Sequence, residues 1–252
     1  AVILGRPRGG RRRFPREQSL TKLDTDDTGV GSYFIANYPP FSFWRSDDLQ
    51  AVEEALDRPG TGVPLGLYVH IPFCREMCRF CGCNVIATHD RTRAESYLEL
   101  LDQEVELVAK RLPHRRTVTQ LHWGGGTPTF LDEKQLERCH EILARRFDFA
   151  KDGEKAIEID PAITTRSQIE TLAKLGFNRI SMGVQDFDPH VQETVGRIQG
   201  VKETAELVQA ARDAGFHGVN LDLIYGLPFQ SSDTWLKTLD RILQIHPDRM
   251  AV

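Results

Sequence analysis

Residues 67–84 read LYVHIPFCREMCRFCGCN: a strand-like run, Leu67–Ile71, leads directly into a loop that carries four cysteines. Three of them follow the spacing C-x3-C-x2-C and the last comes two residues later: Cys74, Cys78, Cys81 and Cys83. Thiolates gathered on one short loop can wrap a single metal centre, because sulfur is a soft anionic ligand. Three thiolates can bind three irons of a [4Fe–4S] cluster and leave the fourth iron open to a non-protein ligand.

A structural zinc site is the main alternative for this loop. Zinc sites usually carry two cysteine pairs about a dozen or more residues apart. Here all four thiols lie within ten residues, and no second Cys/His pair follows them. His70 and His122 lie in strand-like runs, where a packed histidine is the simpler interpretation. A disulfide between two of these cysteines is a further alternative, although the sequence shows no export signal. The spacing favours an iron–sulfur cluster.

Composition sets broad limits on the rest of the molecule. The chain has 252 residues, 40% of them hydrophobic, which is enough for the core of one large domain. A formal charge of −4 gives no argument for nucleic acid or an anionic membrane as a partner. No apolar run approaches the length of a membrane span. Clustered free cysteines suit the reducing cytoplasm. Cys139, alone in a helical pattern, is interpreted as a buried apolar residue.

The N-terminal quarter divides into two segments. Residues 1–30 combine an arginine-rich stretch with Gly, Pro and an acidic patch, so we expect a disordered arm and assign it no function. Residues 31–62 hold many aromatic side chains and are expected to pack against the following domain. The chain starts at Ala1 and stops at Val252 inside a strand-like run, so we expect a fragment of a longer protein.

Residues 63–252 alternate strand-like and helical patterns. The strand-like runs are Leu67–Ile71, Gln120–Trp123, Ala156–Ile159, Arg179–Val184, Val219–Ile224 and the last residues. Apolar residues between them recur every three or four positions, and Thr165 with Gln168 predicts a capping box. Repeated βα units imply a parallel sheet with right-handed crossovers. We therefore predict an α/β fold, a partial (β/α)6 barrel with an N-terminal extension, cut off at its sixth strand. Such barrels carry their functional residues at the carboxyl ends of the strands.

Glycines and polar residues mark these strand ends. Gly124, Gly125 and Gly126 follow the second strand, where the lack of a Cβ lets a ligand approach the backbone. Glu158 stands between two isoleucines on the third strand, so it needs a ligand or a cation as partner. Gln185 and Asp222 lie at the ends of apolar strands, where a simple core would prefer Val or Leu. A tight turn for the glycines, and strand-to-loop ties for the polar residues, remain open as structural interpretations.

Four strings in order resemble a known family. The cysteine spacing after a barrel strand is similar to that of radical S-adenosylmethionine (SAM) enzymes. The strings LYVHIPFCREMCRFCGCN, LHWGGGTPTFL, FNRISMGVQDF and NLDLIYGLP look like the oxygen-independent coproporphyrinogen III oxidases. The resemblance covers about residues 64–252. Residues 32–40, SYFIANYPP, depart from the string that the family carries near its active site.

The resemblance implies a residue set for two cofactors. It assigns the [4Fe–4S] cluster to Cys74, Cys78 and Cys81. Around a first SAM it places Tyr68, Phe80, the glycine run, Glu158 and Arg197. Around a second SAM it places Gly126, Thr127, Gln185, Asp222 and Ile224. Cys83 is not needed as an iron ligand; it is a candidate catalytic redox or hydrogen donor, or a buried thiol. For Tyr68 plain strand packing is an equal alternative.

The implied reaction is the oxidative decarboxylation of coproporphyrinogen III propionates to vinyl groups in haem biosynthesis. One electron would enter SAM and release a 5′-deoxyadenosyl radical, which takes a hydrogen atom from the substrate. Expected partners are the tetrapyrrole and a low-potential electron donor such as flavodoxin or ferredoxin, with the protein a monomer. Two alternatives stay open: methylation or ring opening of another tetrapyrrole, and a haem chaperone without turnover. Cys83 and the second-SAM residues favour catalysis over the chaperone.

Overall fold

The computed structural model describes residues 2–5, 54, 56 and 62–252. Residues 1–7 and 60–252 form one compact unit, and residues 8–59 form another. The expected disordered arm, apart from 2–5, and most of the aromatic segment 31–62 lie outside the described residues. Val2–Gly5 is a strand, β1, although it falls within the range expected to be disordered.

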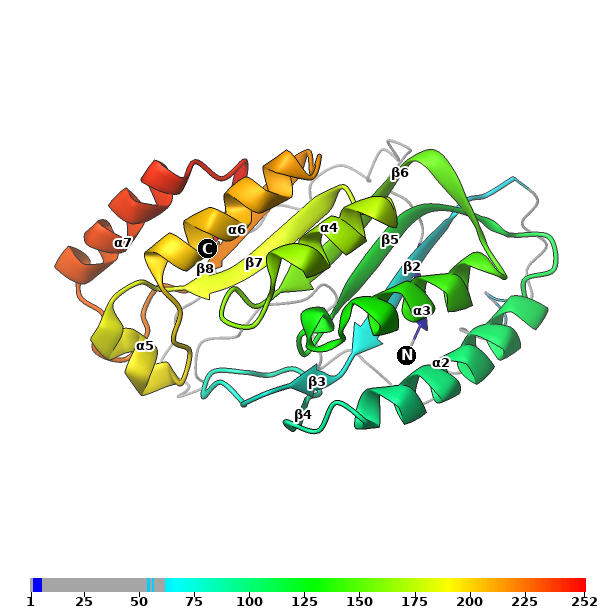
Figure 1. Cartoon of the computed structure of the whole chain (residues 1–252), viewed down its shortest axis with the longest axis horizontal. Coiled ribbons are helices and arrows are strands. Elements are labelled where there is room, and N and C mark those ends of the chain that lie inside the picture. Colours follow the sequence, from blue (N-terminus) through cyan, green and yellow to red (C-terminus); the bar gives the residue numbers. More distant parts are fainter. Residues whose placement is uncertain (1, 6–53, 55, 57–61) are drawn as a thin grey trace, which may run out of the picture. The chain divides into compact units, whose positions relative to one another are not determined.

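The first unit is built on one sheet (Figure 1). Its strand order is β1-β2-β5-β6-β7-β8-β9, and β1 pairs antiparallel with β2 at one edge. The other six strands run parallel in chain order: β2 (Leu65–Ile71), β5 (Thr117–Gly125), β6 (Asp148–Ile159), β7 (Arg179–Gln185), β8 (Gly218–Leu223) and β9 (Arg249–Ala251). The predicted open, partial (β/α)6 barrel is confirmed. The antiparallel edge strand is an addition to it.

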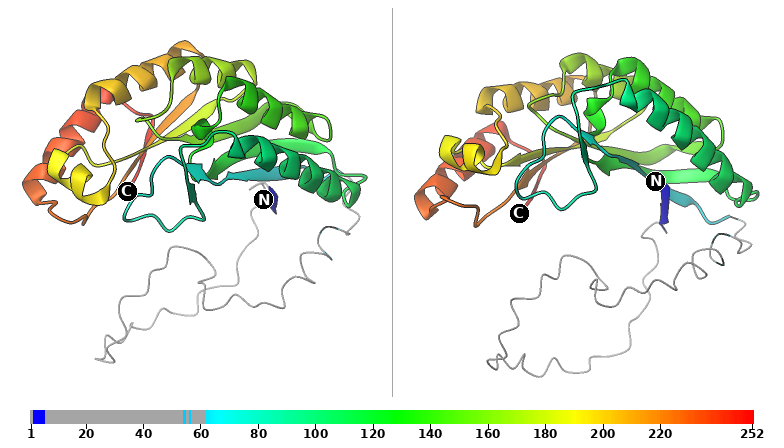
Figure 2. Two further views of the ribbon diagram at one scale, coloured as in Figure 1. Left: turned by 60° about the horizontal axis from the view of Figure 1, so that its bottom comes forward. Right: turned by 90° about the horizontal axis from the view of Figure 1, so that it is seen from below.

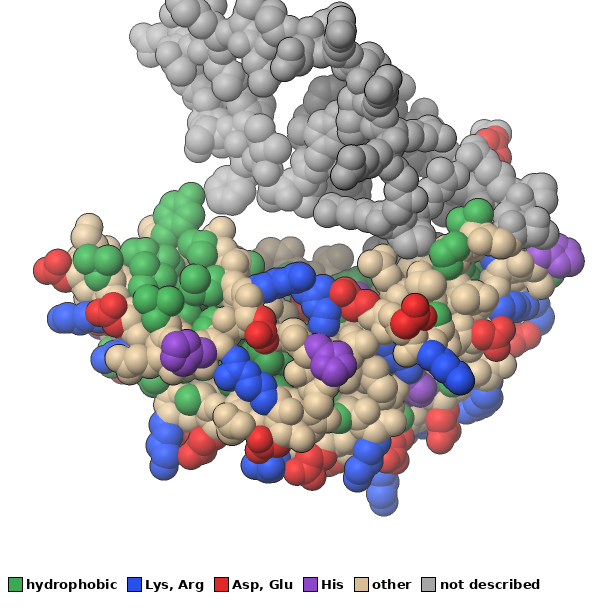
Figure 3. All heavy atoms as spheres, turned by 90° about the horizontal axis from the view of Figure 1, so that it is seen from above, with side chains coloured by type: hydrophobic (Ala, Val, Ile, Leu, Met, Phe, Trp, Pro, Cys, Tyr) green, Lys and Arg blue, Asp and Glu red, His purple; other side chains and the backbone are tan. Residues whose placement is uncertain are grey.

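Helices follow the strands and cover one face of the curved sheet, as Figure 2 shows. They are α2 (Arg93–Lys110), α3 (Glu133–Ala144), α4 (Arg166–Lys174), α5 (Pro189–Val195), α6 (Val201–Asp213) and α7 (Ser232–Ile245). On the face that Figure 3 views, acidic and basic side chains are interspersed. No helix in the described part of the chain is both long and apolar enough to cross a bilayer.

Period-two burial in the strands decides which side chains face the helices. In β2, Leu65, Leu67, Val69 and Ile71 are fully or almost fully buried, while the residues between them are half-buried. In β5 the indole of Trp123 is fully buried against the ring of Phe177, with the two ring centroids 4.7 Å apart. Cys139 of α3 is buried, as predicted. Because the core lies on the helix side, the alternate strand positions are left for the opposite face.

Side-chain caps fix the starts of α3, α4, α5 and α7. The Thr165–Gln168 capping box at α4 is present, and Asp132 with Gln135 forms the same arrangement at α3. Gly176, at φ +84°, follows the end of α4, where a left-handed glycine commonly terminates a helix. The prediction for β6 was too short, since the strand begins at Asp148. Its first half is polar and gives no hydrophobic signal, yet it pairs with β5.

A small second sheet closes the cysteine loop. β3 (Phe73–Cys74) pairs in parallel with β4 (Ile86–Ala87), so both ends of the loop are joined by backbone hydrogen bonds. The Ile86 N–H donates to the Pro72 carbonyl over 2.7 Å and the Thr88 N–H donates to the Cys74 carbonyl over 2.8 Å. The cysteines between them are therefore held at the carboxyl end of β2.

His140, on α3, should make the free energy of unfolding depend on pH. His140 Nε2 lies 3.0 Å from Lys155 Nζ, whose ammonium also donates to the Leu175 carbonyl. Burial, and then the Lys155 charge, lower the pKa of His140 from 6.5 to about 4. The unfolded chain therefore binds a proton on this ring between those values while the folded chain does not.

We expect the free energy of unfolding to fall as pH drops from 6.5 towards 4. The slope should be at most about 1.4 kcal/mol per pH unit, reduced by solvent screening. Urea unfolding at pH 7 and pH 5 measures it, and His140→Gln should show a smaller loss between the two pH values. Equal losses in both proteins would contradict this assignment.

Candidate functional site

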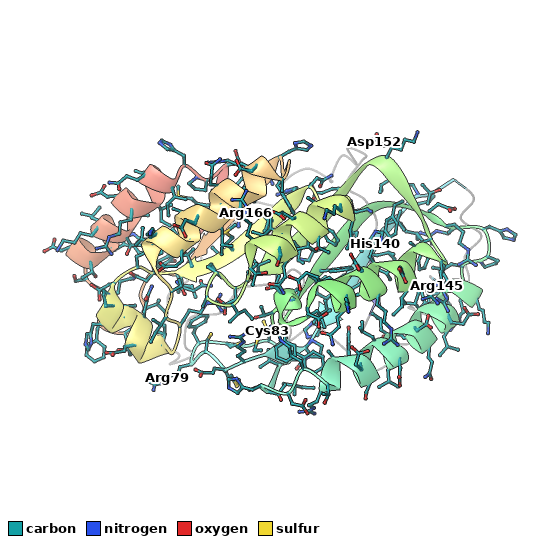
Figure 4. All side chains as sticks on the ribbon, viewed as in Figure 1. Arg79, Cys83, His140, Arg145, Asp152 and Arg166 are labelled. Atoms are coloured by element: carbon teal, nitrogen blue, oxygen red, sulfur yellow. The ribbon has the colours of Figure 1, made fainter. Side chains whose placement is uncertain are left out.

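A cavity of about 160 Å³ opens at the carboxyl ends of the parallel strands. It is bordered by the cysteine loop, on which Figure 4 labels Arg79 and Cys83. The side chains and glycines that line it come from β3, the cysteine loop, the ends of β5 to β8 and the loop between α5 and α6: Cys74, Glu76, Met77, Cys78, Phe80, Cys81, Cys83, Val85, Gly125, Gly126, Thr127, Glu158, Ile159, Gly183, Gln185, Arg197 and Asp222. Twelve of the fourteen site residues predicted from the sequence are among them.

The four loop cysteines are free thiols. Burial raises the pKa of Cys74, and the Thr127 hydroxyl, 3.4 Å from its sulfur, counteracts the rise. Burial, and then the nearby Cys81, raise the pKa of Cys83. In the described part of the chain, no three His, Cys, Asp or Glu side chains are gathered closely enough to hold a single metal ion.

Two arginines join the cysteine loop to the segment after β7. Arg79 donates from its backbone N–H to the Val195 carbonyl over 2.9 Å and from Nη1 to the Thr194 carbonyl over 2.7 Å. Arg197 places Nη1 3.7 Å from the Cys78 sulfur and donates from Nη2 to the Gly183 carbonyl over 2.8 Å. Arg197 thus places a positive charge beside the sulfur of one of the predicted metal-binding cysteines.

The Arg197 guanidinium is itself held by the sheet. Its Nη2 lies 3.4 Å from Asp160 Oδ1, and both side chains are largely buried. Its Nε N–H is buried and makes no hydrogen bond within the described residues. Buried donors are almost always paired, so this one points to a partner that the described residues do not supply. A sulfide or a ligand carboxylate would be such an acceptor.

The glycine run leaves room where side chains would not fit. A Cβ on Gly124 would lie 2.8 Å from a carboxylate oxygen of Glu158, and one on Gly125 2.8 Å from the His70 ring. Gly125 also has φ +116°, which L side chains rarely adopt. A Cβ on Gly126 would lie 2.7 Å from the Phe73 carbonyl oxygen. The run is therefore required by close approach and is more than an ordinary tight turn.

Glu158 is oriented by a histidine that the sequence interpretation had assigned to packing. His122 Nε2 lies 2.9 Å from Glu158 Oε1, and the His122 ring stacks on Tyr68 with centroids 5.7 Å apart. The Tyr68 hydroxyl lies 3.2 Å from His70 Nδ1, and His70 Nε2 lies 2.8 Å from the Asn84 carbonyl oxygen. Burial, then Glu158 and Cys83, raise the pKa of Tyr68 to about 12. These contacts form a polar row beneath the cavity.

Asp222 is the second carboxylate on the cavity wall. It accepts hydrogen bonds from Ser181 Oγ over 2.8 Å and from Asn220 Nδ2 over 2.7 Å. Burial raises its pKa, and these two donors act against the rise. Glu158 and Asp222 thus line one cavity from different strands, and the Arg197 cation lines the same cavity. Such a set can bind a ligand that carries amine, hydroxyl and carboxylate groups.

Two predicted residues lie away from the cavity lining. Tyr68 reaches it only through His122 and Glu158. Ile224 packs against the apolar cluster of Val191, Val195 and Leu227, and its N–H donates to the Gln185 carbonyl over 3.1 Å.

The sequence interpretation missed His70, His122, Asp160 and Ser181. Their signal was available, because each has a polar side chain on or just after a predicted strand of the parallel sheet.

The glycine geometry makes a prediction that needs no ligand. Gly126→Ala should lower the free energy of unfolding by about 1–3 kcal/mol, because the new methyl group meets the backbone of Pro72 and Phe73. Gly82→Ala is the matched control, since nothing lies within 4 Å of its Cβ position. Thermal or urea unfolding measures both. A Gly126→Ala protein as stable as the control would show that the close approach is not rigid.

Comparisons with known proteins agree with this geometry. A family model described as the radical SAM superfamily matches residues 68–242. The oxygen-independent coproporphyrinogen III oxidase of Pseudomonas aeruginosa is 45% identical over 208 residues, covering 82% of this chain and 45% of that protein. The enzyme of the same name from Synechocystis is 44% identical over 242 residues, covering 95% of this chain and 52% of that protein.

Solved structures give the same result. The coproporphyrinogen III oxidase HemN from Escherichia coli, described as a radical SAM enzyme, superposes with a TM-score of 0.75 at 43% identity. The match covers 80% of this chain and 47% of that one. A radical SAM methyltransferase from Kitasatospora setae, TM-score 0.52 at 14% identity, shares the fold alone. The chain spans about half the length of the curated relatives it matches. With the matched model covering most of the described sheet and its cysteine loop, the chain belongs to the radical SAM superfamily.

Proposed function

We propose that this chain carries the radical SAM part of an oxygen-independent coproporphyrinogen III oxidase. The observation that supports it most is one cavity lined by Cys74, Cys78 and Cys81 together with Glu158 and Asp222. Relatives at 44–46% identity bear that enzyme name, and their similarity extends over most of the chain. The radical SAM family uses a [4Fe–4S] cluster and SAM. The substrate would be the tetrapyrrole coproporphyrinogen III.

The cluster would be held by Cys74, Cys78 and Cys81. All three line the cavity, and the closed β3–β4 loop fixes them at one end of the sheet. Arg197 beside the Cys78 sulfur would lower the cost of placing several thiolates together. Its unpaired Nε N–H would then donate to the bound group. Cys83, exposed at the rim, is proposed as a nearby hydrogen or redox donor with no iron ligation.

SAM would lie against the glycine run and the two carboxylates. Gly125 and Gly126 line the cavity and would offer their backbone groups to it, and Glu158, aligned by His122, would accept from an ammonium or hydroxyl group. Phe80 lies at the cavity rim, where its ring can cover the adenine or shield the cluster. Tyr68 supports Glu158 from below. A second SAM is proposed near Thr127, Gln185, Asp222 and the Ile224 backbone.

When bound, the cluster and SAM supply hydrogen-atom abstraction from a carbon of the substrate. A propionate side chain that loses one hydrogen atom, one electron and CO2 becomes a vinyl group. The chain's own residues orient the cofactor, supply acceptors and donors for its polar groups and limit water at the reacting carbon. The protein would work as a monomer with a low-potential electron donor, such as flavodoxin or ferredoxin, in the reducing cytoplasm. Clustered free cysteines suit that environment.

Product analysis tests the proposed reaction. The full-length protein is reconstituted without air and incubated with SAM, a reductant and coproporphyrinogen III. Protoporphyrinogen with methionine and 5′-deoxyadenosine is the expected result. A methylated or ring-opened tetrapyrrole would instead support a related enzyme. Bound haem without 5′-deoxyadenosine would support a haem chaperone.

Replacement of one thiolate tests the ligand assignment. Cys78→Ser should abolish the absorbance of the cluster near about 400 nm and most of its iron, because a hydroxyl is a poor ligand for a soft site. Cys83→Ser is the control and should keep its iron. If Cys78→Ser held as much iron and sulfide as the unaltered protein, the assignment would be wrong.

Asp222→Ala tests the second carboxylate. It should weaken SAM binding or turnover about tenfold or more, because a hydrogen bond to a charged group is lost. Iron content should stay unchanged, since Asp222 bonds only Ser181 and Asn220 in the described residues. Equilibrium dialysis with labelled SAM and an iron assay separate the two effects. Unaltered binding and turnover would exclude Asp222 from the site.

A further inference from the structure

The carboxyl end of β7 has an unusual backbone. Gln185 has φ +68°, one of three positive values among the described residues other than glycine. The Asp186 N–H donates to the Val184 carbonyl over 2.9 Å, which closes a three-residue γ-turn with Gln185 at its centre. The pairing of β7 with β8 shifts register between Gly183 and Gln185. The strand therefore ends in a bulge that turns one side chain aside.

This conformation is strained for any residue with a Cβ. A γ-turn with positive central φ is rare, and glycine would adopt it without the steric cost. A glutamine at such a position indicates that its side chain has a use there. Gln185 lines the cavity, and a Cβ on Gly183 would lie 2.9 Å from Gln185 Nε2 and 2.8 Å from Arg197 Nη2. The amide therefore lies beside the Arg197 guanidinium, in space that Gly183 leaves free.

Two buried glutamines hold the backbone on either side of Gln185. Gln199 Nε2 donates to the Val184 carbonyl and lies 3.5 Å from the Asp186 carbonyl oxygen, so one amide spans both flanks of the turn. Gln192 Nε2 donates to the Asp186 carbonyl over 2.8 Å and to the Gln199 carbonyl over 3.0 Å. Both side chains are only 6% exposed, and neither lines the cavity. Their amide groups therefore serve to hydrogen-bond the backbone of the turn.

The Asp186 carboxylate anchors the turn from the opposite direction. It is 1% exposed, and it accepts hydrogen bonds from Thr238 Oγ1 over 2.6 Å and from the Asp188 N–H over 2.7 Å. Gln230 Nε2 donates to its other oxygen. Its described partners are thus neutral donors from α7 and the adjoining loops. A buried charge that depends on such donors needs them all in place, which ties the turn to α7.

We propose that Gln199 and Asp186 are positioning residues, which hold this strained turn so that the Gln185 amide faces the ligand in the cavity. The inference rests on the proposed function for the identity of that ligand, SAM. It assigns a role to a buried polar cluster that touches neither the cysteines nor the cavity. Arg197, which contacts the Cys78 sulfur, and Gln199, which holds the turn, lie two residues apart on the same short segment. This segment therefore positions both the cysteine loop and the Gln185 amide. Ile198 between them points to solvent, 66% exposed.

The first test separates strain from side-chain function at Gln185 itself. Compared with Gln185→Ala, Gln185→Gly should raise Tm by about 2–4 °C, because glycine relieves the positive φ. Both variants should bind SAM about tenfold more weakly than the unaltered protein after anaerobic reconstitution, with iron content unchanged. A Gln185→Gly protein that melts below Gln185→Ala would overturn the strain argument. Unaltered SAM affinity in both would overturn the role of the amide.

The second test asks whether Gln199 acts through Gln185. Gln199→Met keeps the shape and removes the donor, and it should weaken SAM binding several-fold while the cluster stays. In a Gln185→Ala background it should weaken binding no further, since the positioned group is gone. Gln168→Met is the matched control: Gln168 is also buried and its Nε2 also spans two carbonyls, of Thr129 and Leu131. It should lower Tm without changing SAM affinity.

The outcomes distinguish this inference from the proposed function. Equal loss of affinity from Gln199→Met in both backgrounds would show a general scaffold role and overturn the proposal. Asp186→Asn provides a second variant if Gln199→Met fails to fold, with the same comparison in the two backgrounds. If the unaltered protein holds a cluster but binds no SAM, the proposed function fails. The Tm comparison at Gln185 would still decide the strain argument.

Discussion

The buried Arg197 guanidinium is the interaction on which the site depends. It contacts the Cys78 sulfur, the Gly183 carbonyl and the Asp160 carboxylate, so it joins the cysteine loop to β7 and to the end of β6. A buried cation is costly unless its partners surround it. Here a thiolate would be one of those partners, so the charges of the metal-binding loop and of the sheet are balanced in the same place.

The sheet can carry a polar site because one of its faces packs on the helices and the other carries the polar residues. Alternate residues of β2 are buried on the helix side of the sheet: Leu65, Leu67, Val69 and Ile71. The residues between them are not part of this core and are free to be polar. Register then sets the polar neighbours: Tyr68 pairs with His122, and Glu158 pairs with Ser181. Polar residues of neighbouring strands are thereby brought into contact without a loop to position them.

Much of this was predictable from the sequence. The apolar runs and capping residues such as Thr165 located the six parallel strands and their helices, and the spacing from Cys74 to Cys81 indicated the metal-binding loop. The sequence could not show that His122 orients Glu158, because that contact depends on the register of β5 and β6. The polar first half of β6 was also missed, since its pairing is decided by backbone hydrogen bonds and leaves no hydrophobic pattern.

Gln185 was predicted to lie at the cavity, but the reason it does so is conformational. An ordinary strand end would continue the alternation and send the side chain to a face set by the pleat. The γ-turn and the register shift break that alternation at one residue. Hydrogen bonds to all three carbonyls of the turn offset its conformational strain. Gln199 donates to the Val184 carbonyl, Gln192 to the Asp186 carbonyl and the Ile224 N–H to the Gln185 carbonyl. Local strain and a dense buried polar network at the same strand end are thus one feature, and sequence patterns record neither.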